Sequence, residues 1–219
     1  MEREIVVRGT GEARTLPDLA GLHVEVTAEH RDQDEAYRAR TELAAAVDAV
    51  LAQHADDISR STVASLSVQP KFRWQHGKQV REGWRASRTN VVEVAGLDAL
   101  GPLMNGLVEA GAAVAGPTWS LAPTNPAHEA ARRAAAADAR QRAQAYAEAL
   151  DVGLGPIAWI AEPGLRRGGE PPFEPVARPM MASARFALAG AVEPEGPAEN
   201  LEAAEMTVQA AVEVGFEIL

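Results

Sequence analysis

Two stretches of the sequence place residue types at spacings that could perform chemistry. The first is the pair Gly9 and Gly11 after an apolar run, which is how a nucleotide-phosphate loop often begins. The dinucleotide fingerprint needs a third glycine where this chain has Arg14, and no Gly-Lys-Ser/Thr follows as in a Walker loop. Because an alternating strand-like segment comes next, from Leu22 to Glu29, we expect the two glycines to lie at a bulge or strand end.

The second stretch is residues 71–88, KFRWQHGKQVREGWRASR, which hold six Lys and Arg against one acid in a chain of formal charge −10. Aromatic side chains between cations can bind an anionic small molecule or single-stranded nucleic acid. The candidate ligand-binding residues are Lys71, Arg73, Trp74, Trp84 and Arg85. Alternation along a hairpin should place the three cations on one face, which Arg81 could join, opposite Phe72 and the tryptophans. The alternation favours another interpretation, in which the aromatic face enters the core and the cations pair with acidic surface in this subunit or a neighbour.

The rest of the sequence offers no catalytic constellation. Its five histidines have no metal-ligand spacing, no Gly-x-Ser-x-Gly elbow occurs, and there is no cysteine. We therefore expect a non-enzymatic protein with no catalytic residues, no cofactor and no metal site.

Charge and terminal composition limit the partners and the compartment. A formal charge of −10 disfavours general binding to nucleic acid or to an anionic membrane. No apolar run is long enough to span a bilayer, so we expect no membrane insertion. The N-terminus, MEREIVV, lacks the pattern of a signal peptide, which predicts a cytoplasmic location for the chain as given. A chain from which an export signal had been removed would be periplasmic or exported.

Periodicity predicts the elements between these stretches. Strands are expected at 22–29, 65–74, 79–94, 114–121, 154–162 and 206–218, and helices at 34–54, 97–110 and 126–150. Asp32 or Asp34 can cap the first helix, and Asn125 followed by Pro126 suits the start of the third. The order predicts an α+β fold with a largely antiparallel sheet or sheets covered by helices. It contains two strand-helix-strand-strand units, around 20–94 and 114–218, in a single domain at 1–219.

A proline-rich excursion at 163–200 precedes the last strand and holds seven of the chain's 14 prolines. It contains one apolar island, MMASARFAL, at 180–188. Exposed apolar surface of this kind often mediates association. The candidate self-association residues are Met180, Met181, Phe186 and Leu188.

Several motifs, in order, resemble the SIMPL-domain family over nearly the whole chain. They are Ile5-x-Val7-x-Gly9-x-Gly11-Glu12, Pro17-Asp18-x-Ala20, Val68-x-Pro70-x-Phe72-x-Trp74, Gly83-Trp84-x-Ala86-Ser87, the alanine-rich helix to Leu150, and Val208-x-Ala210-x-Val212-x-Val214-x-Phe216. The family includes bacterial periplasmic and outer-membrane immunogenic proteins and an animal protein associated with a Pelle-like kinase. The resemblance implies an α+β fold of two strand-helix-strand-strand units, a tendency to form homo-oligomers, and links to stress tolerance or signalling. It implies no catalytic residues.

The leading hypothesis is therefore a non-enzymatic, homo-oligomeric scaffold or interaction protein. The alternative is a binding module that takes an anionic small molecule or single-stranded nucleic acid on the hairpin at 71–88.

Overall fold

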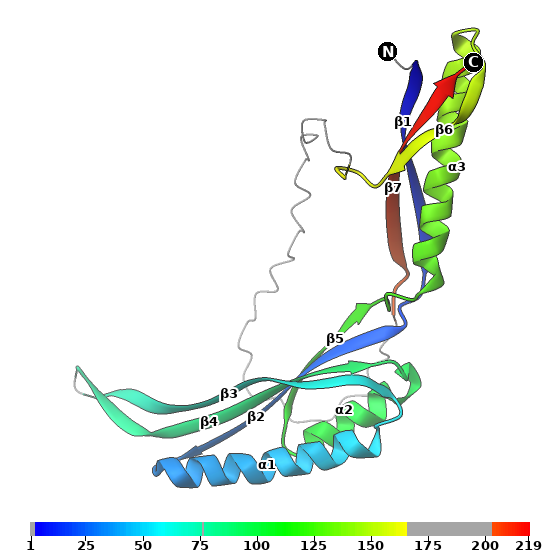
Figure 1. Ribbon diagram of the computed structural model, residues 1–219. Helices are drawn as coiled ribbons and strands as arrows, with labels where there is room; N and C mark the ends of the chain where they lie inside the picture. The colour runs from blue at the N-terminus through cyan, green and yellow to red at the C-terminus, as the bar shows by residue number, and fades with distance from the viewer. Residues whose placement is uncertain (1–2, 76, 166–202) are drawn as a thin grey trace. The chain divides into compact units, whose positions relative to one another are not determined.

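The computed structural model describes residues 3–75, 77–165 and 203–219 (Figure 1). The chain divides into two compact units. We call Leu16–Pro123 the central unit, and Met1–Thr15 together with Thr124–Leu219 the terminal unit. Each unit combines an antiparallel sheet with helices, which confirms the predicted α+β class. The prediction of a single domain at 1–219 stays a prediction.

The central unit is a four-stranded antiparallel sheet with helices on one face (Figure 1). Its elements are β2 (Leu19–His30), α1 (Gln33–Gln53), β3 (Ile58–Gln75), β4 (Lys78–Val94), a 3₁₀ turn (Leu97–Ala99), α2 (Leu100–Glu109) and β5 (Ala113–Ser120). The strand order is β3-β4-β2-β5, so β3 and β5 form the two edges. Asp32 accepts hydrogen bonds from the backbone N–H groups of Asp34 and Glu35, which confirms it as the N-cap of α1.

The core of the central unit lies between this sheet and its two helices. Alternate residues of β2, from Leu22 to Val26, turn toward the helices and are buried with Val92, Leu103 and Leu107. The intervening residues of β2 are polar and face the other side of the sheet. One face of this sheet is therefore packed, and the other carries polar side chains.

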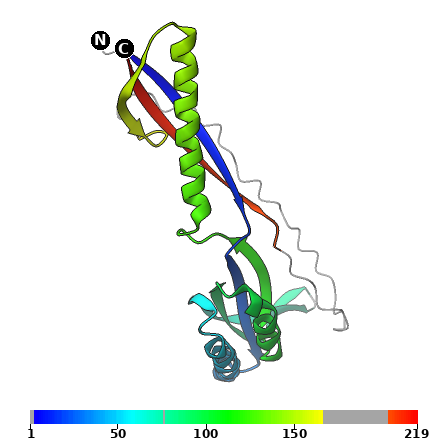
Figure 2. The ribbon, with the colours of Figure 1, turned by 90° about the vertical axis from the view of Figure 1, so that its right-hand side faces the viewer.

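The terminal unit joins the two ends of the chain in one sheet. Its elements are β1 (Glu4–Thr15), α3 (Pro126–Ala149), β6 (Leu154–Ala161) and β7 (Met206–Ile218). The strand order is β1-β7-β6, and β1 pairs with β7 antiparallel from Glu4 opposite Glu217 to Thr15 opposite Met206. The helix α3 runs along this sheet (Figure 2). As predicted, Asn125 caps α3 and Pro126 opens it.

Gly9 and Gly11 lie within β1, so their predicted position at a bulge or strand end is wrong. An ideal Cβ at Gly9 would lie 2.5 Å from the backbone nitrogen of Ala139 and would also overlap the carbonyl oxygen of Ala135. A Cβ at Gly11 would meet the backbone of α3 one turn earlier, at Ala131 and Ala135. The two glycines therefore let the alanine face of α3 lie directly against β1. The two-residue spacing of Gly9 and Gly11 thus places them against successive turns of α3.

The two strand-helix-strand-strand units predicted from the sequence are assembled from different strands than expected. The strand at 114–121, expected to begin the second unit, is β5, which pairs with β2 in the central sheet. The terminal sheet takes β1 instead, from the other end of the chain. Most of the excursion at 163–200 lies outside the described residues, and so do Met180, Met181, Phe186 and Leu188.

Candidate interaction site on the β3–β4 hairpin

The hairpin of β3 and β4 is longer than the strand beside it. The last residue of β2 to pair with β4 is His30, opposite Trp84, so residues 70–83 continue as a two-stranded ribbon (Figure 1). We call residues 70–83 the hairpin arm. Phe72 and Trp74 lie on the same side of the arm and are 51% and 72% exposed. The interpretation that places this aromatic face in the core therefore does not describe Phe72 and Trp74.

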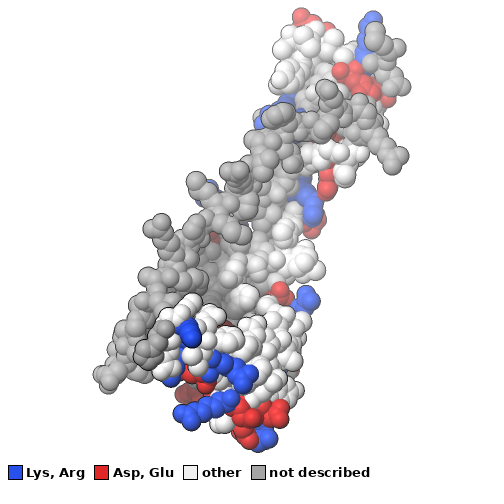
Figure 3. Space-filling view, turned by 90° about the vertical axis from the view of Figure 1, so that its left-hand side faces the viewer, with Lys and Arg blue, Asp and Glu red and all other residues white. Residues whose placement is uncertain are grey.

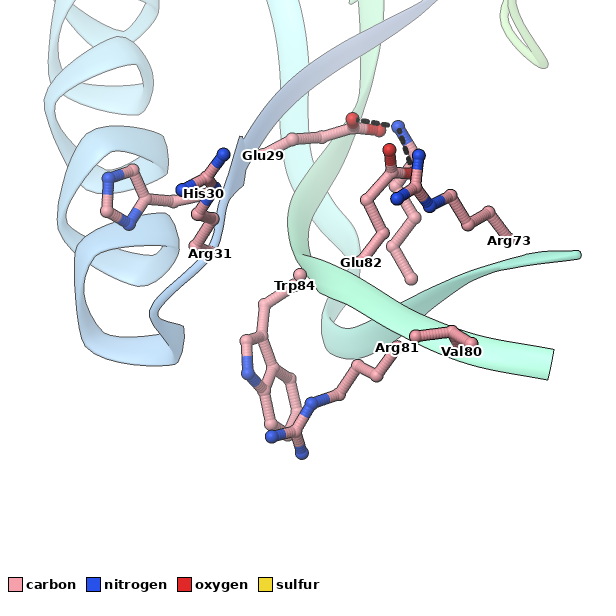
Figure 4. Close-up of a pocket in the computed structure, with 10 residues that line it drawn as sticks. Glu29, His30, Arg31, Arg73, Val80, Arg81, Glu82 and Trp84 are labelled. Carbon is pink, nitrogen blue, oxygen red and sulfur yellow. Dashed lines mark hydrogen bonds and ion pairs between the residues drawn. The ribbon is translucent and has the colours of Figure 1, made fainter. Parts of the chain in front are cut away.

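Two of the predicted cations are held by a carboxylate from the neighbouring strand. Glu29 of β2 accepts hydrogen bonds from the Lys71 ammonium and from Arg85, whose Nε lies 2.8 Å from Glu29 Oε1. Figure 4 shows Glu29 pointing into this cluster, with Glu82 and Arg73 close by. Lys71 first and then Arg85 lower the pKa of Glu29 below its ordinary 4.5. Lys71 and Arg85 are thus already paired within the central unit.

Arg81 lies on the aromatic side of the arm rather than with the other cations. Glu82 is an extra residue in β4, because Lys71 is opposite Gly83 whereas Phe72 is opposite Arg81. This bulge reverses the alternation, and the Arg81 guanidinium lies 5.4 Å from the centre of the Trp84 ring (Figure 4). The expectation that Arg81 could join the face of Lys71 is therefore wrong.

An open hollow of about 480 Å³ lies at the base of the arm. The charged side chains that line it are Glu29, Arg31, Lys71, Arg73, Arg81 and Glu82. Four cations and two carboxylates therefore line the hollow, and Figure 3 shows the Lys and Arg side chains gathered at this end of the central unit. Arg73 makes no ion pair with another described residue. Arg31 and Arg81 likewise make no ion pair with another described residue, so Arg31, Arg73 and Arg81 are the cations best placed to meet an anion from outside.

The helix α1 carries a buried arginine that the sequence reasoning did not single out. Arg40 is 5% exposed, and its Nε and Nη2 have no hydrogen-bond partner among the described residues. Its guanidinium lies 4.6 Å from the centre of the Tyr37 ring. The signal was present in the sequence, because Arg40 falls in phase with the apolar residues of the helix. Tyr37 itself is half exposed.

An ion pair that the sequence did not reveal links α1 to the sheet. Arg88 of β4 donates two hydrogen bonds to Asp48 of α1, at 2.7 and 2.9 Å, and one to Asn90. These side chains are 40 positions apart in the sequence, so no local spacing could have identified the pair. Within the described residues, no three His, Cys, Asp or Glu side chains gather closely enough to share a metal ion. The described helices include none with the length and apolar character needed to span a bilayer.

Comparison with known proteins gives consistent matches. Residues 5–216 match the family described as SIMPL, protein of unknown function (DUF541). The chain is 31% identical over 156 residues to "Uncharacterized protein YggE" of Escherichia coli (strain K12), a match that covers 70% of this chain and 63% of that protein. The protein of the same name from Edwardsiella ictaluri (strain 93-146) is 28% identical over 155 residues, which is 70% of this chain and 65% of the relative. The chain thus spans less than two thirds of the length of these curated relatives.

Proposed function

The chain belongs to the SIMPL family, and we propose that it is a non-enzymatic interaction protein that forms homo-oligomers through its hairpin arm. The observation that carries the proposal is the aromatic side of the arm, where Phe72 and Trp74 lie in solvent. Large aromatic side chains contribute most to association when a partner covers them. A surface that a single chain leaves uncovered is the surface that a second chain can bury.

The backbone of the arm supports the same proposal. A two-stranded ribbon is marginally stable by itself, and residues 70–83 have no third strand beside them among the described residues. The strand β3 is also an edge strand along its whole length, with Val63 and Leu66 exposed. An exposed edge of this kind offers unpaired N–H and C=O groups to another chain. Association would therefore stabilise the arm as well as cover its aromatic side chains.

The native mass of the purified chain tests the proposal. Light scattering over a range of concentrations should give at least twice the chain mass of 23.2 kDa for the wild type. The double variant Phe72→Ser and Trp74→Ser should have a lower mass with an unchanged circular dichroism spectrum. The matched control is Tyr146→Ser, because Tyr146 is also an exposed aromatic residue but lies on α3. A wild type that stays monomeric at every concentration would refute self-association.

A second candidate function is the binding of an anion at the base of the arm. The specific observation is the excess of cations around the hollow, together with the stacking of Arg81 on Trp84. Because Glu29 already pairs with Lys71 and Arg85, this function would depend on the cations of the hollow that make no ion pair with another described residue, Arg31, Arg73 and Arg81. A fluorescent oligothymidylate should then bind with an affinity that falls as salt increases.

Charge reversal at two of these unpaired cations tests the second candidate. The double variant Arg73→Glu and Arg81→Glu should abolish the salt-sensitive binding. Arg133→Glu serves as the control, since Arg133 is an exposed arginine that pairs with Glu129 on α3. Equal binding by the wild type and the double variant would rule out this site.

A further inference from the structure

We propose that the hairpin arm of one copy seats Trp74 in an apolar groove on the terminal unit of a second copy. This inference rests on the proposed self-association and adds the second surface of the contact. Trp74 is the most exposed aromatic side chain among the described residues. An indole supplies a large apolar surface and one N–H donor, so it needs an apolar recess with an acceptor at its border.

The terminal unit contains such a recess. A groove of about 320 Å³ lies between α3 and the strands β6 and β7. Its apolar lining comes from Ala135, Ala136, Ile160, Ala161, Ala211 and Val212. Ile160 is 62% exposed, a large aliphatic side chain that the terminal unit leaves mostly in solvent.

The groove follows from unequal strand lengths. The strand β7 pairs with β1 from Met206 to Glu217, whereas β6 reaches only as far as Ala161 opposite Glu213. The part of β7 from Met206 to Val212 therefore has no strand beside it on that side, within the described residues. The alanine side chains of α3 are short and leave room above this part of the sheet.

Charge favours the arm as the occupant. The segment 71–88 has six basic residues and one acid, whereas the residues that make up the terminal unit include 17 acids and 11 bases. At the groove, Glu162 makes no ion pair with another described residue and can accept the indole N–H or face Arg73 of the arm. Arg132 also lines the groove, so the acidic excess belongs to the unit as a whole rather than to the recess alone. The local positive charge of the arm therefore complements the net negative charge of the terminal unit, which favours this orientation.

The contact uses two different surfaces, which has a consequence for assembly. Each copy offers one arm and one groove, so two copies can exchange arms in a closed pair, or each copy can engage two different neighbours in a ring or a filament. A chain without a working arm still has its groove, and a chain without a working groove still has its arm. A mixture of two such chains should therefore form a 1:1 dimer that neither chain forms alone.

That mixture is the test. Trp74→Ser removes the anchor, and Ala136→Arg fills the groove with a bulky cation at an exposed helix position. Each variant alone should weaken self-association by about thirtyfold, the effect of losing a buried aromatic anchor. Equimolar mixing should restore a dimer in sedimentation velocity. Ala137→Arg, on the same helix but outside the groove, should behave as the wild type.

Other outcomes would overturn the inference in distinguishable ways. If Ala136→Arg keeps the wild-type mass while Trp74→Ser does not, the groove is not the receptor, although the proposed function survives. If both variants are monomeric and the mixture remains so, the arm of one copy does not bind in the groove of another. If a monomeric chain with Ala136→Cys and Met181→Cys forms an internal disulfide, the groove is occupied by residues 180–188 of the same chain and not by the arm of a second copy. A monomeric wild type would refute the proposed function itself.

Discussion

The contact of β1 with α3 makes a quantitative prediction for Gly9→Ala. The added Cβ would lie 2.5 Å from the nitrogen of Ala139 and 2.7 Å from its Cβ, whereas ordinary contacts begin near 3.4 Å. The nearest obstacles are backbone atoms of a helix, which cannot rotate away. The helix must therefore move outward by about 1 Å, and a gap of that size forfeits roughly a quarter to a half of each dispersion contact along it.

The cost can be bounded from comparable changes. Overpacking a well-filled site costs about 1–3 kcal/mol, and replacing glycine returns about 0.4–1 kcal/mol through the unfolded state. We expect Gly9→Ala to lose about 2 kcal/mol of unfolding free energy, which corresponds to a Tm lower by roughly 4–8 °C in a chain of this size. Gly21→Ala is the matched control, because Gly21 also lies in a strand but its Cβ would have only an ordinary contact of 3.6 Å with the carbonyl oxygen of Thr118.

Urea denaturation followed by circular dichroism gives the free energy, and hydrogen exchange locates the change. Exchange should accelerate in the peptides of α3 and β1 and stay unchanged in those of the central unit, because the glycine lies in the terminal unit. If Gly9→Ala were as stable as Gly21→Ala to within about 0.5 kcal/mol, α3 would not lie directly on β1, and the reasoning would be refuted.

Three further predictions concern carboxylates. The hydrogen bond from the Thr10 N–H, and to a smaller extent that from Arg142, lower the pKa of Asp138 below its ordinary 3.8. The stabilising effect of the Asp138 carboxylate is thus complete at neutral pH and is lost as pH falls through the folded pKa. The Tm difference between wild type and Asp138→Asn should therefore shrink as pH is lowered to about 2. Glu29→Gln should release two cations and strengthen salt-sensitive anion binding, measured by anisotropy, and unchanged binding would argue against the hollow. Asp32→Ala should cost about 1 kcal/mol in urea denaturation and exceed the effect of Asp34→Ala, since only Asp32 caps α1.

The sequence predicted the elements well because their ends are marked by local chemistry. Asn125 and Pro126 start α3, and Gly111, at a φ of +87°, follows the end of α2. In β7, every second position is apolar, seven positions in the 13-residue strand, so this strand was predictable without knowledge of the strand it pairs with. Each of these features depends on residues within one or two turns of each other.

Which strands pair with each other was not predictable in the same way. Alternation determines the face of the sheet on which a side chain lies, but it does not determine which strand lies beside it. The sequence does not tell that β1 pairs with β7 about 200 positions later, or that β5 joins the central sheet. The same limit hides Glu29, which reaches cations 42 and 56 positions away. The bulge at Glu82 was unpredictable for a different reason. One extra residue moves every side chain beyond it to the opposite face of the strand, and nothing in the composition marks that residue.

The exposed aromatic side chains show why a correct pattern led to an incorrect location. Phe72 and Trp74 alternate with polar residues just as Leu22 and Val24 do, yet only the latter pair is buried. The difference is one of length, because β2 has 12 residues while β3 and β4 have 18 and 17. The helix α1 starts at Gln33, three residues after β2 ends, and runs back along the sheet, so no described helix of the central unit covers the arm. The apolar face of β3 and β4 extends beyond the helix that covers the rest of the sheet, and this difference in length leaves exposed the surface on which the proposed self-association rests.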